Sequence, residues 1–305
     1  SVLREASEGL NLRMVAAPNT FHALQPGATT LQTIDPEDIA YIQYTSGSTR
    51  FPRGVVIKHH TAMANIEGMV VDGLRIDSND RFASWLPFYH DMGLVGFVLV
   101  PVATQLSVDY LDTRDFAMRP RQWLNLMTQT GATISFAPSF GYDLCARRLR
   151  DADIAKYDLS NWRVAGIGAE MIRPQTLEQF ADQLAACGFD SRAFLACYGM
   201  AECTLGISFS PLAQGFTTHY VDSDQLADAH EVVLMDESEQ SGRGRHFVNC
   251  GRPLPSYEVE VRDENGDRLE DWRSGVIHVR GPSVMSGYFN SPEESGCTLS
   301  EDGWL

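Results

Sequence analysis

The sequence predicts an α/β protein in which parallel sheets flanked by helices are followed by a smaller β subdomain. Two observations support this prediction. Between residue 39 and about residue 209, apolar runs of strand length alternate with helical patterns, which is the order expected when helices connect parallel strands. From residue 246 onward, apolar and polar residues alternate as they do in strands with one exposed face. The 305 residues are enough for one large domain or two modest ones.

The elements of the α/β part follow from the length and period of its apolar patterns. Strands are expected at 39–44, 54–58, 82–86, 106–111, 132–137, 162–167 and 193–198. Over 61–74, apolar residues from Met63 onward recur with helical spacing, which predicts a helix. Over 174–187, a second helix is predicted because Pro174 suits the first turn and Gly188 is a good stop signal.

The chain changes character after residue 210. Residues 211–245 are polar and rich in Asp, Glu, Ser and Gly, which predicts an insertion or long loop with a short strand at 231–235. The acidic stretch 222–240 leaves a regulatory interaction surface open as a hypothesis, although a solvated loop explains the composition equally well. The α/β part is therefore expected to occupy residues 1–210.

Residues 246–305 are expected to form the β-rich subdomain. Apolar residues alternate with charged ones between Tyr257 and Arg262, as in a half-exposed strand. The Asn-Gly pair at 265–266 predicts a hairpin turn, and the next strand is expected at 275–280.

Composition excludes several classes of protein. The net charge of −16 argues against sequence-independent nucleic-acid binding, which needs clustered Lys and Arg. The longest apolar stretch, Met92 to Val100, is too short to span a bilayer. No signal-peptide core is visible near residue 1, and no CxxC pair occurs among the six cysteines, which predicts reduced thiols in a cytoplasmic protein.

The segment YTSGSTRFPRG at 44–54 is the most informative part of the sequence. Hydroxyl side chains and exposed backbone N–H groups in a glycine-bearing loop form a concavity that suits anions. Arg50 and Arg53 add positive charge at the end of this loop. Phosphate is the ligand that this chemistry favours over a plain polar turn. No Walker A loop, complete Rossmann fingerprint, GxSxG elbow or zinc spacing is present, so a nucleotide would need another loop design.

This loop resembles the phosphate loop of adenylate-forming enzymes, the superfamily of acyl-CoA synthetases, peptide-synthetase adenylation domains and luciferases. Four further motifs follow in the order that the superfamily shows, and together they extend the resemblance from residue 44 to residue 288. They are WLPFYHDMGL at 85–94, GAE at 168–170, YGMAECT at 198–204 and GVIHVRGPSVMSGY at 275–288. The resemblance implies the large-domain fold of these enzymes, with the ATP- and acyl-binding motifs within residues 1–210.

Within the superfamily, the chain is most similar to the fatty-acyl-AMP ligases. STRFPRG, WLPFYHDMGL, YGMAECT and the long segment after Glu202 all fit that branch. The resemblance implies a ligase that activates a fatty acid with ATP and Mg²⁺ to acyl-AMP plus pyrophosphate, for transfer to an acyl carrier protein. Residues 211–245 would be the insertion associated with that acceptor. An acyl-CoA synthetase and a non-catalytic nucleotide- or acyl-binding module stay open as alternatives.

The resemblance also implies a role for each motif residue. The triphosphate would be held by Thr45, Ser46, Gly47, Ser48, Thr49 and Gly54. The leaving pyrophosphate would meet Arg53, and the metal would be held by Glu202 and Thr45. The adenine and phosphate surroundings would come from Gly168, Ala169, Glu170, Tyr198, Gly199, Met200, Ala201 and Thr204. Many relatives carry a threonine where this chain has Ala201, so its hydroxyl contact is either missing here or supplied by Thr204.

The acyl side of the site is implied in the same way. His90 would lie beside the carboxylate and the α-phosphate. The acyl pocket would be lined by Met92, Gly93, Phe136, Ser139 and Phe140. Each assignment has a structural alternative: His90 as a structural histidine, Tyr198 as a core residue, Glu202 as an exposed helix residue, and the acyl residues as ordinary core.

The two lysines of the chain lead to an expectation about its activity. Relatives use a lysine from a C-terminal lid domain, and neither Lys58 nor Lys156, the two lysines of the chain, matches that position. The 305 residues are therefore expected to lack the lid domain, to bind ATP weakly and to form acyl-AMP very slowly.

Overall fold

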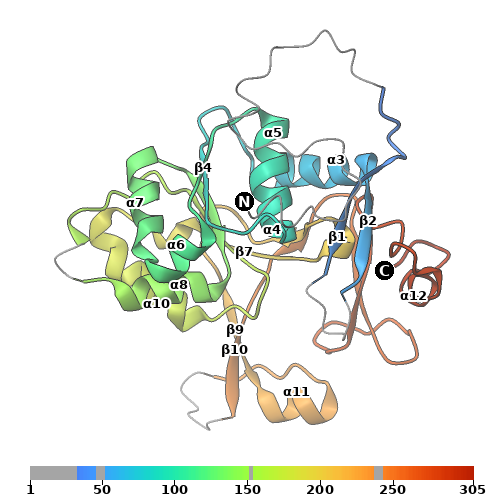
Figure 1. The fold of residues 1–305 in the computed structure, drawn as a ribbon. Helices are drawn as coiled ribbons and strands as arrows, with labels where there is room; N and C mark the ends of the chain where they lie inside the picture. The colour runs from blue at the N-terminus through green and yellow to red at the C-terminus, as the bar shows by residue number, and fades with distance from the viewer. Residues whose placement is uncertain (1–32, 46–51, 151–153, 237–242) are drawn as a thin grey trace. The chain divides into compact units, whose positions relative to one another are not determined.

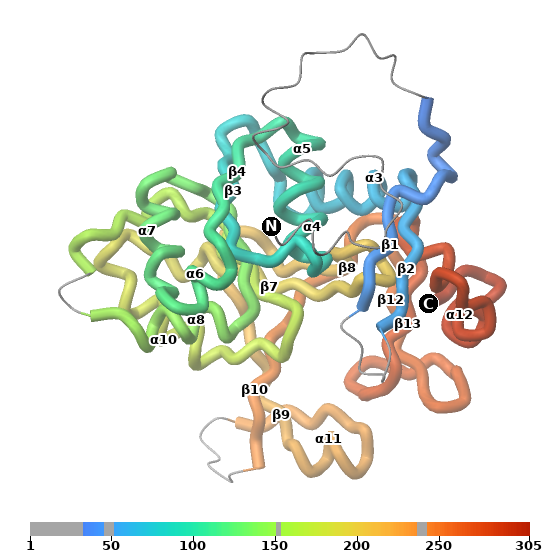
Figure 2. Tube along the Cα trace, in the orientation of Figure 1, coloured from blue at the N-terminus to red at the C-terminus, as the bar shows by residue number. Residues whose placement is uncertain are grey.

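The computed structural model describes residues 33–45, 52–150, 154–236 and 243–305 (Figure 1, Figure 2). Residues Pro36–Leu305 form one compact unit. Among the described residues, we find no helix with the length and apolar character needed to cross a bilayer.

Seven strands form the central sheet, in the order β11, β8, β7, β6, β5, β3 and β4. Their bounds are β3 Phe82–Ser84, β4 Val108–Tyr110, β5 Ile134–Ala137, β6 Val164–Ile167, β7 Phe194–Gly199, β8 Gly206–Phe209 and β11 Arg252–Pro253. The five strands from β7 to β4 run parallel, which confirms the predicted parallel sheet. β8 pairs antiparallel with β7, and β11 pairs antiparallel with β8 at the edge of the sheet. The carboxyl ends of β5, β6 and β7 therefore meet at one edge, where ligands bind in open α/β sheets.

Helical segments cover this sheet and support its ends. They are α3 His59–Gly68, η1 Met69–Gly73, α4 Asp91–Leu94, η2 Val95–Leu99, α5 Val100–Thr104, α6 Thr113–Met118, α7 Arg121–Thr130, α8 Ser139–Arg148, α10 Pro174–Leu184, η3 Ala185–Cys187, η4 Ser191–Ala193 and η5 Ala201–Cys203. The two predicted helices are confirmed as α3 with η1 and as α10 with η3. The first ends in a π-helical turn, and the second stops at Gly188 in the left-handed region, with φ of +82°.

Two neighbouring residues of β5 show how the sheet is covered. Ser135 accepts a hydrogen bond of 2.9 Å from the indole of Trp123 on α7. The ring of Phe136 lies 6.0 Å from that of Phe97 on η2. Because successive strand residues point to opposite faces, α7 and η2 cover opposite faces of the sheet (Figure 1).

The first two strands depart from the expected arrangement. β1 (Ile39–Tyr44) and β2 (Gly54–Lys58) form at the predicted positions, but they pair antiparallel as a separate two-stranded sheet. The expectation that they join the parallel sheet was wrong. The nine residues 45–53 are enough for a hairpin, whereas a parallel crossover needs a dozen or more.

The polar segment 211–245 contains regular structure. β9 (Thr218–Asp222) pairs antiparallel with β10 (Gly244–Val248), and α11 (Ser223–Ala229) follows β9 directly (Figure 2). The predicted strand at 231–235 was wrong, because only isolated bridges at Glu231 and Leu234 form there. β10 also runs across the predicted boundary between residues 245 and 246.

The last part of the chain is β-rich, as predicted. β12 (Glu258–Arg262) and β13 (Val276–Arg280) pair antiparallel. Gly266 in the predicted turn has φ of +87°, and its N–H donates to Asp263 O at 3.1 Å. The last helix is α12 (Pro292–Thr298).

Candidate active site

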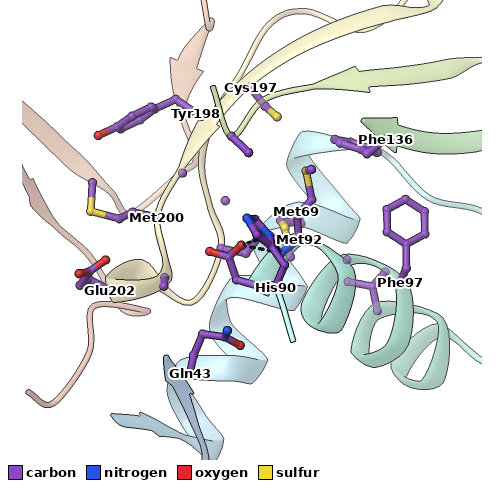
Figure 3. Close-up of a pocket in the computed structure, with 18 of the residues that line it drawn as sticks. Gln43, Met69, His90, Met92, Phe97, Phe136, Cys197, Tyr198, Met200 and Glu202 are labelled. Carbon is purple, nitrogen blue, oxygen red and sulfur yellow. Dashed lines mark hydrogen bonds and ion pairs between the residues drawn. The ribbon is translucent and has the colours of Figure 1, made fainter. Parts of the chain in front are cut away.

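A cavity of about 640 Å³ opens beside the carboxyl end of β7 (Figure 3). Its wall combines residues from the β1–β2 hairpin, from α4 with η2, and from the β7–η5 turn. Eleven of the residues proposed from the sequence line it: Thr45, Arg53, His90, Met92, Phe136, Ala169, Tyr198, Gly199, Met200, Ala201 and Glu202. Proposed site residues as far apart in the chain as Thr45 and Glu202 thus share one cavity.

The cavity is polar on one side and apolar on the other. Figure 3 shows Glu202 and Tyr198 on one side, Phe97 and Phe136 on the other, and His90 between them. Both phenylalanine side chains are almost fully buried. A ligand with a charged head and an apolar tail would match this division.

Two hydrogen bonds join the described ends of the segment between β1 and β2, which is predicted to bind phosphate. Thr45 N donates to Arg53 O at 2.9 Å, and Arg53 N donates to the Thr45 hydroxyl oxygen at 3.3 Å. This pairing continues the β1–β2 ladder and presents residues 45 and 53 to the cavity. The predicted phosphate ligands Ser46, Gly47, Ser48 and Thr49 lie outside the described residues.

The guanidinium of Arg53 has two neighbours in the β-rich part. It lies 3.4 Å from a carboxylate oxygen of Glu294 on α12. Its central carbon is 5.1 Å from the centre of the Tyr288 ring, which is a cation–π distance. Arg53 therefore brings a permanent positive charge to the wall of the cavity.

Glu202 stands on η5, directly after β7. Its Oε1 accepts a hydrogen bond of 3.0 Å from the Tyr288 hydroxyl, and its backbone O accepts one of 2.8 Å from Met285 N. Both donors come from one short segment of the β-rich part. The carboxylate is thus held at the cavity wall with its second oxygen not engaged by this tyrosine.

His90 and Asp91 form a close pair where β3 leads into α4. His90 Nδ1 lies 2.7 Å from Asp91 Oδ1, and Met92 N donates to that same oxygen at 2.6 Å. Met92 N also donates to Nδ1 at 3.2 Å, so its hydrogen is shared between the His90 and Asp91 side chains at the start of α4. The hydrogen bond with Asp91 raises the pKa of His90, and burial opposes this shift only in part.

The remaining described residues that were proposed from the sequence do not line the cavity: Gly54, Gly93, Ser139, Phe140, Gly168, Glu170 and Thr204. Thr204 is buried and donates its hydroxyl to Ser283 O at 3.2 Å. Glu170 accepts a hydrogen bond of 2.9 Å from Phe140 N at the start of α8. Direct ligand contacts by these seven residues stay predictions.

Several cavity residues were missed from the sequence. Asp91 and Tyr288 lie inside the motifs and carry polar groups, so the motif itself was an available signal. Met69 and Phe209 belong to patterns that are typical of any core, and only the tertiary structure brings them to the cavity. Gly96 lines the cavity from η2, within the apolar stretch Met92 to Val100.

The donor set suits a metal that arrives with a nucleotide. Among the described residues, no group of three or more His, Cys, Asp or Glu side chains could hold a metal ion alone. Magnesium is commonly bound by one or two carboxylates together with substrate phosphates. Glu202 and Thr45 offer such a partial set on one cavity wall.

Known proteins share both the sequence and the fold. The chain is 45% identical to a candidate acyl-CoA synthetase of Caulobacter vibrioides over 92% of this chain and 49% of that protein. It is 38% identical to the medium-chain fatty-acid–acyl-carrier-protein ligase TtuA of Teredinibacter turnerae over 87% of this chain and 41% of that protein. A solved structure from work on fatty acyl-adenylate ligases of E. coli and L. pneumophila matches with a TM-score of 0.87 and 49% identity, over 94% of this chain and 52% of that one.

The match to a protein family covers most of the sequence. The chain spans about half the length of the curated relatives that it matches. Residues 5–289 match the family described as AMP-binding enzyme. With the family match, the relatives and the shared fold in agreement, the chain belongs to the AMP-binding enzyme family.

Proposed function

We propose that the protein activates a fatty acid with ATP, forming acyl-AMP and pyrophosphate, and passes the acyl group to the thiol of an acyl carrier protein. The observation that carries this proposal is the division of one cavity. Thr45, Arg53 and Glu202 provide hydroxyl, cationic and carboxylate groups on one side, and buried aromatic side chains line the other. The similarity to proteins named as fatty-acid ligases supports the same substrate class.

The nucleotide would take the polar side of the cavity. Tyr198 offers an aromatic face for a purine, and Ala169, a small residue, lines the same cavity. The triphosphate would extend toward Thr45 and Arg53, where backbone and guanidinium N–H groups suit phosphate oxygens. Magnesium bound with the nucleotide at Glu202 and Thr45 would supply positive charge against the phosphate oxygens.

The reaction would be a substitution at the α-phosphorus. A carboxylate oxygen of the fatty acid forms the new P–O bond, and the bond to pyrophosphate breaks with its electron pair on the leaving oxygen. Arg53 would neutralise that leaving charge, while His90, with Nδ1 on Asp91, would place Nε2 between the carboxylate and the phosphate. The contribution of these residues is mainly positioning and charge neutralisation.

The proposal is tested by following acyl-AMP directly. The full-length protein is incubated with ATP, Mg²⁺ and a series of fatty acids, and acyl-AMP and pyrophosphate are quantified by mass spectrometry and a coupled assay. Arg53→Ala is expected to lower the rate by about 100- to 1,000-fold because it removes a charge at the leaving group. Arg147→Ala, on the exposed side of α8, is the matched control and is expected to leave the rate unchanged.

The acceptor is tested in a second reaction. Holo acyl carrier protein and coenzyme A are offered together, and the proposal predicts acylation of the carrier protein. Acylation of coenzyme A alone would favour the acyl-CoA synthetase alternative, as the name of the C. vibrioides relative suggests for that protein. Nucleotide binding without any acyl-AMP would favour a non-catalytic binding module.

A further inference from the structure

Tyr288 joins three parts of the candidate site that are distant in sequence. It lies after β13, in the segment Met285–Phe289, and its side chain lines the cavity. The residue is only 7% exposed and packs in a small core with Val55, Ile57 and Met285. Its ring is therefore fixed by packing, while its hydroxyl reaches the cavity wall.

Backbone hydrogen bonds tie this segment to the strand that follows the phosphate loop. Val56 N donates to Gly287 O at 3.0 Å, and Phe289 N donates to Gly54 O at 2.7 Å. A bridge between Val55 and Tyr288 completes the pairing. Tyr288 thus has a fixed position relative to β2 and to Arg53 at the end of the loop.

The same segment holds Glu202 at two points. Met285 N donates to its backbone O at 2.8 Å, and the Tyr288 hydroxyl donates to its Oε1 at 3.0 Å. A carboxylate held by one hydrogen bond keeps one preferred orientation, and it keeps the other oxygen for another partner.

We infer that Tyr288 is a positioning residue, which orients Glu202 toward the magnesium of bound Mg·ATP through its hydroxyl and steadies Arg53 through its ring. The inference rests on the proposed function, because that function requires the nucleotide and its metal in this cavity. Residues that hydrogen-bond a metal ligand fix its orientation, and their loss commonly lowers metal affinity by about 10- to 100-fold.

The test distinguishes the contribution of the Tyr288 hydroxyl from that of its aromatic ring. Tyr288→Phe keeps the aromatic ring under Arg53 and the packing against Val55, and removes the hydroxyl, with its hydrogen bonds to Glu202 and to the Arg53 side chain. Binding of an ATP analogue with a methylene group between the α- and β-phosphorus is measured by calorimetry in the full-length protein, with Mg²⁺ and with a chelator. We expect about a 10- to 100-fold weaker affinity with Mg²⁺ and a clearly smaller loss without it.

A double-mutant cycle tests the route through the carboxylate. In a Glu202→Ala background, Tyr288→Phe is expected to cause no further loss of Mg-dependent affinity, because the group it orients is absent. Tyr142→Phe is the matched control, since it also removes a buried hydroxyl bond, of 3.0 Å to Gly166 O, and is expected to leave the magnesium dependence unchanged.

The outcomes distinguish this inference from the proposed function. A Tyr288→Phe protein that binds the magnesium complex like the wild type would overturn the inference, as would an equal loss with and without magnesium. If the wild type binds the magnesium complex yet forms no acyl-AMP, the proposed reaction fails, and Tyr288 is still judged by the binding data. A wild type that binds no nucleotide would overturn both.

Discussion

At the residue scale, the pair His90 and Asp91 sets the charge between the polar and apolar sides of the cavity. The Asp91 carboxylate pairs with the imidazole and accepts from Met92 N, while His90, the N-cap residue of α4, also accepts from Met92 N. The hydrogen bond raises the pKa of His90 above its usual value of 6.5. A charged imidazole at the junction of the polar and apolar sides would attract a fatty carboxylate.

Asp91→Asn is expected to lower the pKa of His90, because asparagine lacks the negative charge that favours the charged imidazole. The asparagine side-chain oxygen can still accept a hydrogen bond from Met92 N. A raised pKa in the folded state stabilises the fold below the pKa of the unfolded chain, and this contribution disappears as the pH rises through the folded pKa. The wild type should thus lose stability relative to Asp91→Asn on raising the pH from 6.5 upward. NMR titration of His90 and urea unfolding against pH measure both effects. Asp112→Asn, a cap of α6 without a histidine, is the control, and an unchanged His90 pKa in Asp91→Asn would refute the account.

Arg53 and Glu294 provide a second test at this scale. The pair is 3.4 Å apart and partly exposed, with 31% and 48% of the two side chains accessible, so it adds little to stability. If pyrophosphate uses the same guanidinium, Glu294 competes with it. Glu294→Gln is therefore expected to bind pyrophosphate more tightly with little change in stability, as measured by calorimetry. Weaker pyrophosphate binding would instead show that Glu294 orients Arg53 for the ligand.

At the scale of elements, the π-helical segment η2 shapes the apolar side of the cavity. Phe97 on η2 packs against Phe82 of β3 and Phe136 of β5, with ring centres 6.0 Å apart in each pair. Gly96, the preceding residue, faces the cavity, and a Cβ added there would meet its nearest neighbour, Leu205, at 3.7 Å. A methyl group fits at this position, whereas a longer side chain would extend into the cavity.

Under the proposed function, Gly96→Leu is therefore expected to shorten the longest fatty acid that is adenylated, while Gly96→Ala changes the chain-length preference little. Replacing glycine within a helix also raises helix propensity, so the fold should not be weakened for that reason. Adenylation rates across acids of increasing chain length give the measurement. Val102→Leu, on an exposed position of α5, is the control. An unchanged chain-length profile in Gly96→Leu would mean that the acyl group lies elsewhere.

At the scale of the whole molecule, one buried amide joins the α/β part to the β-rich part. Asn65 on α3 is fully buried and donates to Gly206 O at 2.8 Å, to the Tyr257 hydroxyl at 3.1 Å and to Ser283 Oγ at 3.2 Å. Its own oxygen accepts from Gly206 N at 3.0 Å. Ser283 Oγ in turn donates to Cys203 O at 2.7 Å, so the network fixes the turn that carries Glu202.

Asn65→Leu is expected to lower the free energy of unfolding by at least about 2 kcal/mol, because both backbone groups of Gly206 lose a buried partner. Urea unfolding followed by circular dichroism measures the change. Asn125→Leu, which removes a partly buried side-chain bond to Gln122 on α7, is the control and should cost less. Equal costs for the two variants would show that the network does not join the two parts.

The sequence predicts the positions of most strands, because apolar runs bounded by polar residues are local signals. It does not predict the pairing of β1 with β2, which depends on partners chosen by the rest of the fold. Within 211–245 the signal for α11 was present but missed, since Asp222 caps that helix by accepting from Asp224 N and Gln225 N.

The ordered motifs predict much of the candidate site, whereas tertiary contacts supply the rest. Thr45, His90, Tyr198 and Glu202 meet in one cavity as the motifs imply. The hydrogen bond of Tyr288 to Glu202 joins residues 86 positions apart, and no local pattern predicts such a contact.

The central claim is that one cavity takes a nucleotide and an acyl chain together. It is tested most directly by calorimetric titration of the full-length protein with a stable mimic in which a fatty acyl group is joined to adenosine through a sulfamoyl link, beside AMP and the free fatty acid. Because linking makes the second binding event intramolecular, the account predicts that the mimic binds at least about 100-fold more tightly than either part alone. A mimic that binds no more tightly than AMP would contradict the account.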